Sequence, residues 1–445
     1  MSSPSNTTVG RSTGMLPAGW KRSTLESLLT VSIGGIWGEE HGQSEVDVDV
    51  VRVTELRSHG DIEQRTAAKR SITKKQFQSR ALEVGDLLLE KSGGGPNTPV
   101  GRVGYVSSVN SPTVCSNFMQ LMRPDTEKVL PTYLHLFLTF LHSNGETIPL
   151  QTSTTNIRNI KTSEYMAINV PVTSPSEQVK IVGILEEQFS RLDAALASVR
   201  AVRQKSARFR RSLLHAAFTG ELSGQKIATG TLPDGWRRGT IEQVADVVTG
   251  RTPTKFEQRL ERSVTENRNV PFYKVGDMNS AAQYLKAARV YFAESEANSF
   301  GIEILPSGTV IFPKAGGAIA TNKKRVLEVP GAIDLNCMGV SGNGALLPKL
   351  LFWFFESFNL SSIADGSVLP QIGKKRVAKI EICFPESKSE QIKLLEDIES
   401  SISNSDAVER MSEAIEKKSS ALRRSLLYAA FSGNLTREWR EGAHV

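Results

Sequence analysis

The chain has 445 residues, a formal net charge of +7 and a pI near 9.2, and 39% of its residues are hydrophobic. This is an ordinary globular composition with room for roughly two to four domains. The three cysteines lie far apart with no histidine pair nearby, which argues against a disulfide scaffold or a zinc site and fits a reducing compartment. The most apolar windows, 129–141 and 346–355, are too short to span a bilayer.

The basic charge has two interpretations. It is either a solvated surface with an excess of lysine and arginine or, if the charges cluster, a surface for a polyanionic partner. Residues 1–15 are rich in Ser and Thr and lack an apolar core, so they are not a secretory signal, and we expect a disordered tail. The expected localisation is cytoplasmic.

The chain repeats itself. LPAGW at 16–20 returns as LPDGW at 232–236, SEQVKI at 176–181 returns as SEQIKL at 389–394, and RRSLLHAAFTGEL at 210–222 returns as RRSLLYAAFSGNL at 423–435. The matches stay in order at nearly one offset, which indicates duplication of a unit far longer than a solenoid repeat. The tryptophan of LPxGW is interpreted as a packing anchor at the start of a domain, with base stacking as the alternative.

Each copy begins with strand-like runs, interrupted by one short apolar helix, and then enters a long helix. Ser176 and Ser389 are plausible N-caps, and Gly220 is expected to end the first long helix. The expected boundaries are a tail 1–15, a globular region 16–174, a helix 175–222, a linker 223–231, a globular region 232–387, a helix 388–435 and a tail 436–445.

The long helices carry an apolar seam at spacings of three and four residues, which predicts pairing as a coiled coil. In the second copy the apolar period shifts phase after Ile402, so a stutter is expected there. The predicted pairing residues are Val182, Leu185, Phe189, Leu192, Leu196, Val199, Leu395, Ile398, Ile402, Met411 and Ile415. The prediction is an α+β chain with pseudo-twofold internal duplication, in which two mixed α/β domains are each followed by a long helix and the helices pair antiparallel. The alternative is that each helix packs back on its own domain.

No catalytic or metal-binding motif is recognisable. GxxxxGK[ST], HExxH, clustered Cys and His, and the Asn/Asp-Pro-Pro-aromatic segment of an amino-methyltransferase are all missing. The sequence therefore favours binding over catalysis, with no catalytic residue and no metal ligand assigned.

Two kinds of loop could hold an anion in each half. Glycine-rich loops at 90–102 and 312–325 carry Lys and Arg beside glycines, which let backbone N–H groups approach phosphate oxygens. The alternative is a hairpin that needs positive φ. Polar loops at 151–161 and 365–376 carry residue types that read base edges, although polar loops are also common on surfaces. The candidate DNA-contact residues are Arg52, Lys69, Arg70, Lys74, Lys75, Lys91, Ser92, Gly94, Arg102, Thr154, Asn156, Arg158, Lys274, Lys314, Gly316, Lys323, Lys324, Arg325, Gln371, Lys374, Lys375 and Arg376.

This ordered set of repeats resembles the DNA-specificity subunits of type I restriction–modification systems. The resemblance covers residues 16–435 and includes TGRTPTK at 249–255 and LLxAAFxGxL at the end of each long helix. The first half departs from it, since VSIGGIWGEEHG stands where the second half has TGRTP, so its entry loop is expected to be remodelled.

The resemblance implies two target recognition domains that each read half of a split DNA site, and helices that set the spacing. It also implies two docked methyltransferase subunits and motor–nuclease subunits as partners. S-adenosylmethionine, ATP and Mg are expected on those partners, with no cofactor on this chain. The repeated helix end predicts two matching docking surfaces for the partner, formed by Leu213, Leu214, Phe218, Leu426, Leu427 and Phe431. The alternatives are an adaptor of another defence or methylation complex, or an unrecognised DNA-modifying enzyme.

Overall fold

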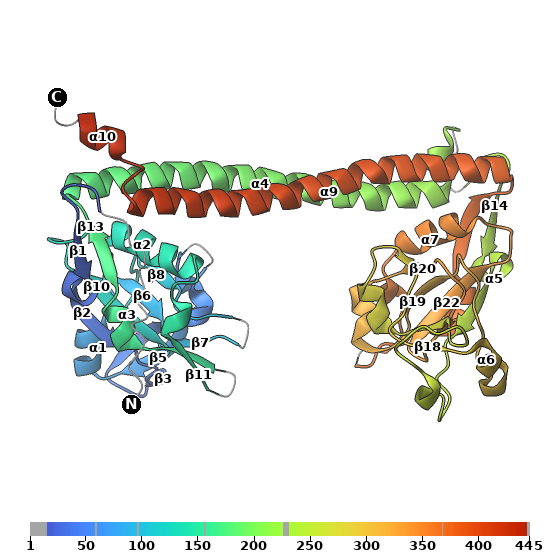
Figure 1. Cartoon of the computed structure of the whole chain (residues 1–445), viewed down its shortest axis with the longest axis horizontal. Helices are drawn as coiled ribbons and strands as arrows, with labels where there is room; N and C mark the ends of the chain where they lie inside the picture. The colour runs from blue at the N-terminus through green and yellow to red at the C-terminus, as the bar shows by residue number, and fades with distance from the viewer. Residues whose placement is uncertain are drawn as a thin grey trace. The chain divides into compact units, whose positions relative to one another are not determined.

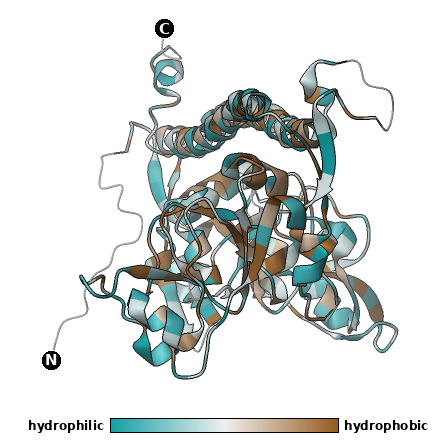
Figure 2. Cartoon of the chain, turned by 90° about the vertical axis from the view of Figure 1, so that its right-hand side faces the viewer, coloured by the Kyte–Doolittle hydropathy of each residue, from teal (hydrophilic) through white to brown (hydrophobic). Residues whose placement is uncertain are grey.

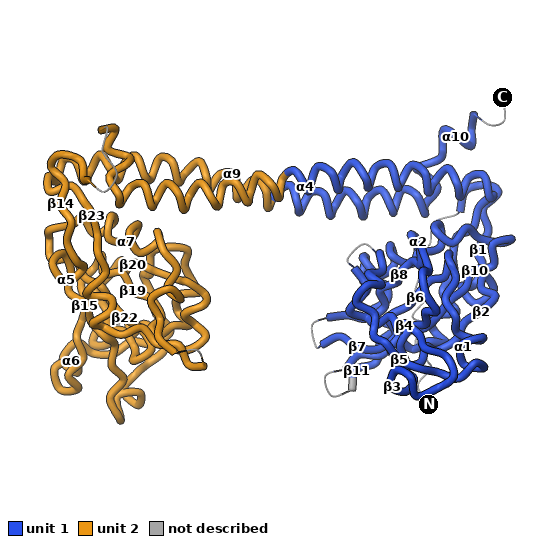
Figure 3. Tube along the Cα trace, turned by 180° about the vertical axis from the view of Figure 1, so that it is seen from behind, with its two compact units in different colours: residues 1–198, 414–445 blue, residues 199–413 orange. Residues whose placement is uncertain are grey.

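The computed structural model describes residues 16–57, 60–95, 98–154, 157–225, 231–366 and 368–442. The predicted N-terminal tail and most of the predicted linker lie outside these residues. The chain divides into two compact units, residues 1–198 with 414–445 (unit 1) and residues 199–413 (unit 2), coloured blue and orange in Figure 3. Each unit therefore combines one predicted globular region with part of both long helices, whereas the sequence had suggested a division in chain order.

In its described residues, the globular part of unit 1 contains four sheets and three short α-helices (Figure 1). Its strands are β1 (Lys21–Thr24), β2 (Leu29–Gly34), β3 (Glu39–Glu40), β4 (Val46–Val51), β5 (Ala68–Ile72), β6 (Leu87–Glu90), β7 (Ser92–Gly93), β8 (Val103–Tyr105), β9 (Thr113–Cys115), β10 (Met119–Pro124), β11 (Gln151–Thr154), β12 (Ile157–Ile160) and β13 (Asn169–Val172). Its helices are α1 (Lys74–Arg80), α2 (Pro131–Ser143) and α3 (Thr162–Met166). The sheet orders are β1-β13, β2-β10-β6-β8, β11-β12-β7 and β3-β5-β4-β9.

Unit 2 repeats the central part of this topology. Its strands are β14 (Trp236–Thr240), β15 (Ala245–Thr249), β16 (Val270–Tyr273), β17 (Tyr284–Leu285), β18 (Tyr291–Phe292), β19 (Val310–Pro313), β20 (Arg325–Leu327), β21 (Ala332–Ile333), β22 (Cys337–Gly342) and β23 (Glu381–Pro385). Its short helices are α5 (Ile241–Val244), α6 (Glu294–Phe300), α7 (Pro348–Glu356) and α8 (Lys374–Ala378). First and last strands pair as β1-β13 and β14-β23, and β15-β22-β19 corresponds to β2-β10-β6. The duplication seen in the sequence is therefore a duplication of fold.

Two long helices, α4 (Pro175–Thr219) and α9 (Lys388–Phe431), contribute to both units. In unit 1 Arg423 of α9 forms an ion pair with Asp193 of α4, and in unit 2 Arg210 of α4 forms an ion pair with Asp406 of α9. In each unit the beginning of one helix packs against the end of the other, which confirms the antiparallel pairing. Gly220 and Gly433 follow the helix ends with φ of 88° and 77°, as expected for left-handed terminators.

The repeated SEQ motif has a structural role. Gln178 and Gln391 are buried, and each Oε1 accepts the backbone N–H of the residue before a domain helix, at 2.7 Å from Leu130 and 3.0 Å from Leu347. Each Nε2 donates to the backbone carbonyl at the end of the preceding segment, that of Thr173 or Pro385. One side chain thus joins the long helix to the globular part in each unit.

The expected stutter in the second helix is wrong. Burial along α9 keeps a 3.5-residue period through Ile398, Ile402, Ser405, Ser412 and Ser419. Small serines can occupy the seam because the facing helix supplies apolar or hydrogen-bonding groups; the Oγ atoms of Ser206 and Ser405 lie 2.5 Å apart.

Most of the other predicted pairing residues are at least half-buried, but Met411 is 64% exposed and does not belong to the seam. Ile415 is 40% exposed and borders a cleft of about 200 Å³ between the helices of unit 1, together with Leu192 and Leu196.

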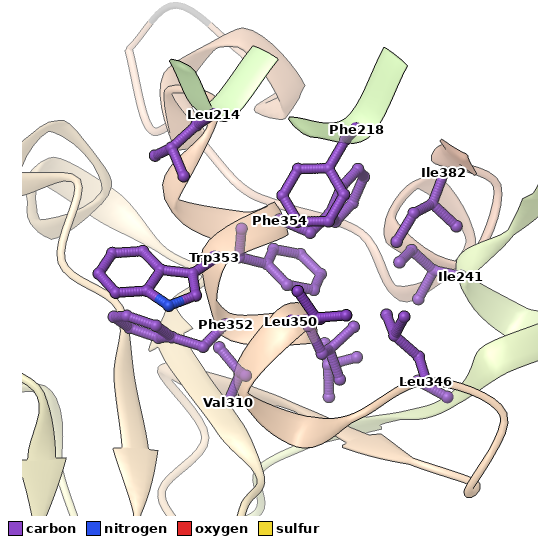
Figure 4. Close-up of a cluster of buried hydrophobic side chains, with 14 of the residues drawn as sticks. Leu214, Phe218, Ile241, Val310, Leu346, Leu350, Phe352, Trp353, Phe354 and Ile382 are labelled. Atoms are coloured by element: carbon purple, nitrogen blue, oxygen red, sulfur yellow. The ribbon is translucent and has the colours of Figure 1, made fainter. Parts of the chain in front are cut away.

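The predicted docking residues are core residues, so that prediction is wrong. Leu213, Leu214 and Phe218 are buried in unit 2 against α7, where the Phe218 and Phe354 rings meet edge to face at 5.3 Å (Figure 4). In unit 1, Leu427 and Phe431 are buried, and Leu426 is half-buried, against the core that contains α2. Apolar side chains at the helix end pack on the nearest apolar surface, which is the domain helix. Figure 2 shows hydrophobic residues gathered in the interior beneath the long helices.

The expected C-terminal tail contains a further helix, α10 (Arg437–Gly442). Its Arg440 and the preceding Thr436 donate hydrogen bonds to the buried carboxylate of Glu177, which also accepts from Thr173 and, at 3.0 Å, from Trp20 Nε1. Burial by itself raises the pKa of Glu177, but the hydrogen bonds from Thr173, Thr436 and Arg440 outweigh it and hold the pKa below its usual 4.5. LPxGW is therefore a packing anchor in unit 1, as expected.

We expect Glu177→Gln to lower the free energy of unfolding of unit 1 by about 1–3 kcal/mol at about pH 7, because Arg440 loses its carboxylate. A lowered folded-state pKa means that the stability from Glu177 is fully present above 4.5 and is lost as pH falls through that lower value. Wild type therefore loses this contribution on acidification and Glu177→Gln does not. Urea unfolding over a series of pH values from about 7 downward measures the difference.

The matched control is Glu390→Gln, because Glu390 occupies the same position of the repeat and is exposed. Its effect should stay within about 0.5 kcal/mol. Equal acid sensitivity of wild type and Glu177→Gln would contradict the role of this carboxylate.

Candidate nucleic-acid interface

The two loops that the sequence singled out in the first half lie side by side. Strand β7 of the glycine-rich loop pairs with β12 of the polar loop through Ser92 and Asn159. The Ser92 hydroxyl donates to Asn159 Oδ1 at 2.6 Å, and the N–H of Ile160 donates to the carbonyl of Lys91 at 2.8 Å. The glycine-rich and polar loops of unit 1 therefore form one surface.

Unit 2 repeats this arrangement with different residues. Ala315 forms a bridge with Gln371, and the N–H of Ile372 donates to the carbonyl of Lys314 at 2.8 Å. The N–H of Gly316 also donates to the carbonyl of Pro370 at 2.8 Å. The same two loops thus meet at the same place in both units.

The glycines of these loops adopt backbone conformations that other residues rarely adopt. Gly94 has φ of 68°, and a Cβ there would lie 2.4 Å from the carbonyl oxygen of Thr98. Gly316 also has φ of 68°. The explanation that the loop needs positive φ therefore holds at both positions.

Four of the predicted cations are exposed and form no ion pair within the described part of the chain: Lys74, Lys75, Lys374 and Lys375. Others are neutralised at the surface, since Lys69 pairs with Asp49, Lys274 with Glu257 and Arg376 with Asp365. The exposed lysines are the groups best placed to meet phosphate oxygens, because they need not break an ion pair first.

Lys324 is not a phosphate contact, contrary to the prediction. It is fully buried, and its Nζ donates to Asn322 Oδ1 and to the carbonyl of Phe358, both at 2.9 Å. Burial lowers the pKa of Lys324 to about 8. The neighbouring Arg325 donates to the carbonyls of Met278 and Ala281, so this basic run stabilises the fold.

Two further predicted arginines use their guanidinium groups within unit 1. Arg102 makes a two-pronged ion pair with buried Glu90, at 2.8 and 3.1 Å. Arg52 makes a similar pair with buried Glu55, at 3.1 and 2.7 Å. Buried carboxylates need such partners, so few donors remain for DNA.

The remaining predicted contacts divide into two groups. Lys323 binds Asn279, and Arg158 donates to the carbonyl of Gly95. Asn156 and the side chain of Thr154 lie outside the described residues.

Comparison with known proteins gives a consistent result. The type I restriction modification DNA specificity domain matches residues 233–417. The chain is 21% identical to the type I restriction enzyme StySPI specificity subunit of Salmonella potsdam, over 96% of this chain and 91% of that one. It is 20% identical to the EcoKI specificity subunit of Escherichia coli (strain K12), over 96% and 92% of the two chains.

Solved structures agree on the fold. A chain solved in work on complex assembly and conformational transition of the type I R-M system has a TM-score of 0.75 at 16% identity, covering 95% of this chain and 100% of that one. The HsdS subunit of Thermoanaerobacter tengcongensis has a TM-score of 0.55 at 16% identity, covering 95% and 99%. The family model, the curated relatives and the solved structures together support a type I DNA specificity subunit.

In unit 1, the loop within VSIGGIWGEEHG contains a feature that charge patterns did not indicate. Trp37 is 39% exposed, and the Arg70 guanidinium lies 5.1 Å from its ring centroid. The loop starts at Gly35, where a Cβ would lie 2.2 Å from the carbonyl oxygen of Ser116; at Gly250 in unit 2 a Cβ would lie 1.9 Å from that of Asp334. Gly35 of IGGIWG and Gly250 of TGRTP are equivalent, because at both positions only glycine fits against the neighbouring carbonyl oxygen. This shared glycine is the sequence signal that aligns the two loops.

Specificity subunits of type I systems are generally non-catalytic. Within the described ranges, no group of three or more His, Cys, Asp or Glu residues is placed to hold a metal ion. Among the same residues, no helix has the length and apolar character required to cross a membrane.

Proposed function

We propose that the chain reads a bipartite DNA site with its two globular parts, one half-site each, and that it acts without catalytic residues of its own. The observation that carries this proposal is the repeated surface in which a Lys-x-Gly loop pairs with a polar hairpin in both units. A two-stranded ribbon fits the major groove, where base pairs present distinct patterns of donors and acceptors. Exposed lysines beside the ribbon would position it on the phosphates.

We also infer where two methyltransferase subunits dock. Val202 and Phe209 on α4 are 50% and 54% exposed, and Ile415 and Leu422, at the same positions of the repeat on α9, are 40% and 48% exposed. Large apolar side chains exposed at equivalent positions of both copies favour an apolar contact made twice. They replace the buried residues that the sequence had suggested.

Charge defines the chemistry of this partner surface. Lys205 and Lys418 are also equivalent in the repeat, each on the same helix face as its apolar pair, and both are exposed. Neither forms an ion pair or hydrogen bond within the residues that the structure describes. The surface suits an amphipathic partner segment with acidic residues beside an apolar seam.

Cofactors belong to the partners in this proposal. S-adenosylmethionine would be held by the methyltransferase subunits, and ATP and Mg by motor–nuclease subunits, with none bound by this chain. The long helices, which contribute to both recognition units, would set the spacing of the half-sites.

The experiment combines this chain with a candidate methyltransferase subunit and maps methylated adenines on random duplex DNA. We expect methylation at one split sequence, and none from the chain alone. The double variant Phe209→Asp, Leu422→Asp should keep sequence-specific DNA binding and lose methylation by at least about tenfold, because it places a carboxylate in each apolar contact. Methylation by the chain alone would overturn the non-catalytic role.

A further inference from the structure

The polar hairpins of the two units share an apolar residue that their polar composition conceals. In unit 1, Asn159 pairs with Thr152 on one side and with Ser92 on the other. In unit 2, Gln371 forms the same two bridges, with Asp365 and Ala315. Asn159 and Gln371 are therefore equivalent positions, and the residues two places before them can be compared directly.

Those residues are Ile157 and Leu369, and both are large, aliphatic and exposed. Ile157 is 46% exposed and Leu369 is 74% exposed, and Val368 beside Leu369 is 88% exposed. A single exposed aliphatic residue is normal on a protein surface. Recurrence at the same place in two loops whose other residues differ indicates a use for the apolar group.

In unit 2, backbone hydrogen bonds hold the residues on either side of the apolar pair. Backbone hydrogen bonds join Asp365 and Gln371 in both directions at 2.8 Å, and Gly366 turns the chain with φ of 85°. The loop is also joined to the glycine-rich loop by the N–H of Gly316. Such a loop can present an aliphatic residue without a large loss of conformational entropy on binding.

The surroundings identify the ligand as a polyanion with an apolar feature. The exposed cations Lys374 and Lys375, which form no ion pair among the residues that the structure describes, follow the loop directly. An aliphatic side chain gains nothing from a phosphate, so its contact is an apolar group of the sugar or of a base edge. In the major groove of DNA, the apolar group that a base pair presents is the C5-methyl of thymine.

We propose that Leu369, with Val368, and Ile157 in the other unit contact thymine methyl groups in the major groove. This assignment rests on the proposed function, since it requires that each unit reads a half-site. It predicts that each half-site contains a thymine whose methyl group contributes to affinity.

The test uses the full chain assembled with its methyltransferase partner, and duplexes that carry the mapped site. Each thymine of the half-site read by unit 2 is replaced in turn by deoxyuridine, which removes only the methyl group. We expect one or two replacements to weaken binding by wild type about threefold to fourfold, the value of one buried methyl. The variant Leu369→Ser should bind the thymine duplex more weakly by a similar or larger factor and be insensitive to deoxyuridine at that position.

The control is Val329→Ser, an exposed valine of unit 2 outside these loops, which should behave as wild type. Wild type that is indifferent to every deoxyuridine, or a Leu369→Ser variant that stays equally sensitive, overturns the methyl contact. A further outcome would overturn the methyl contact in favour of insertion of the side chain between bases. In that outcome Leu369→Ser binds more weakly, and the fluorescence of a 2-aminopurine in the duplex rises only in complexes with wild type. Absence of any sequence preference in wild type is a different result, and it overturns the proposed function.

Discussion

Replacing residues 16–174 with the same region of a related specificity subunit will change one half of the recognised DNA sequence and leave the other half intact. The physical reason is that the hairpin and glycine-rich loop of unit 1 are built entirely from this segment. Binding to the original site should fall by about 10³-fold or more, the usual ratio between specific and non-specific affinity. Mapping of methylated adenines measures the new sequence directly.

The structure adds conditions to this exchange. The donor segment must supply a tryptophan at position 20 and a threonine at position 173, because both donate to Glu177 of α4. It must also supply aromatic residues on the helix that covers Phe431. The reciprocal exchange of residues 232–387 is the control and should change the other half alone. If either exchange altered both halves, the two units would not be independent readers.

Phe431→Ala is expected to lower the free energy of unfolding of unit 1 by about 3–5 kcal/mol. The Phe431 ring lies among Tyr133, Phe137 and Phe140, with centroid distances of 5.3, 5.1 and 5.7 Å. Removing it leaves a cavity between α9 and α2 that the surrounding helices cannot fill without moving. Urea unfolding, with the midpoint and slope compared to wild type, measures the loss.

The control is Tyr428→Ala, one turn earlier on α9, where the side chain is 59% exposed. Its effect on stability should be much smaller, since little apolar area leaves water there. If Phe431→Ala left stability unchanged and abolished binding of the methyltransferase subunit, the interpretation of the helix end as a partner surface would be restored.

Periodicity and repetition allowed the architecture to be predicted, because both depend on local order in the chain. The seam from Val182 to Val199 predicted α4, and Gly220 after the first LLxAAF motif predicted where this helix ends. LPxGW and SEQ could be recognised as anchors from their repetition. Their partners could not, since the bonds from Trp20 and Thr436 to Glu177 join residues far apart in sequence.

The positions of lysines and arginines in the sequence predicted the DNA-contact residues less well than the hydrophobic pattern predicted the fold. Lys323, Lys324 and Arg325 form one basic run, yet Lys324 is buried and Arg325 caps carbonyl groups of its own unit. A lysine or arginine looks the same in a sequence whether it faces phosphate, a buried carboxylate or a carbonyl. Only the folded neighbours distinguish these cases, because the cost of burying a charge depends on what surrounds it.

The helix ends show the same division. The repetition of RRSLLHAAFTGEL indicates that the two copies have the same role. Their amphipathic pattern indicates that this role includes burial of an apolar face. Whether that contact is with a partner or with the chain's own domain depends on which surface the helix meets after folding. In unit 2 Leu214 and Phe218 pack against α7, so this apolar face is buried within the unit and is not available to a partner. A hydrophobic stripe specifies burial but not the surface that buries it, since the hydrophobic effect has no direction.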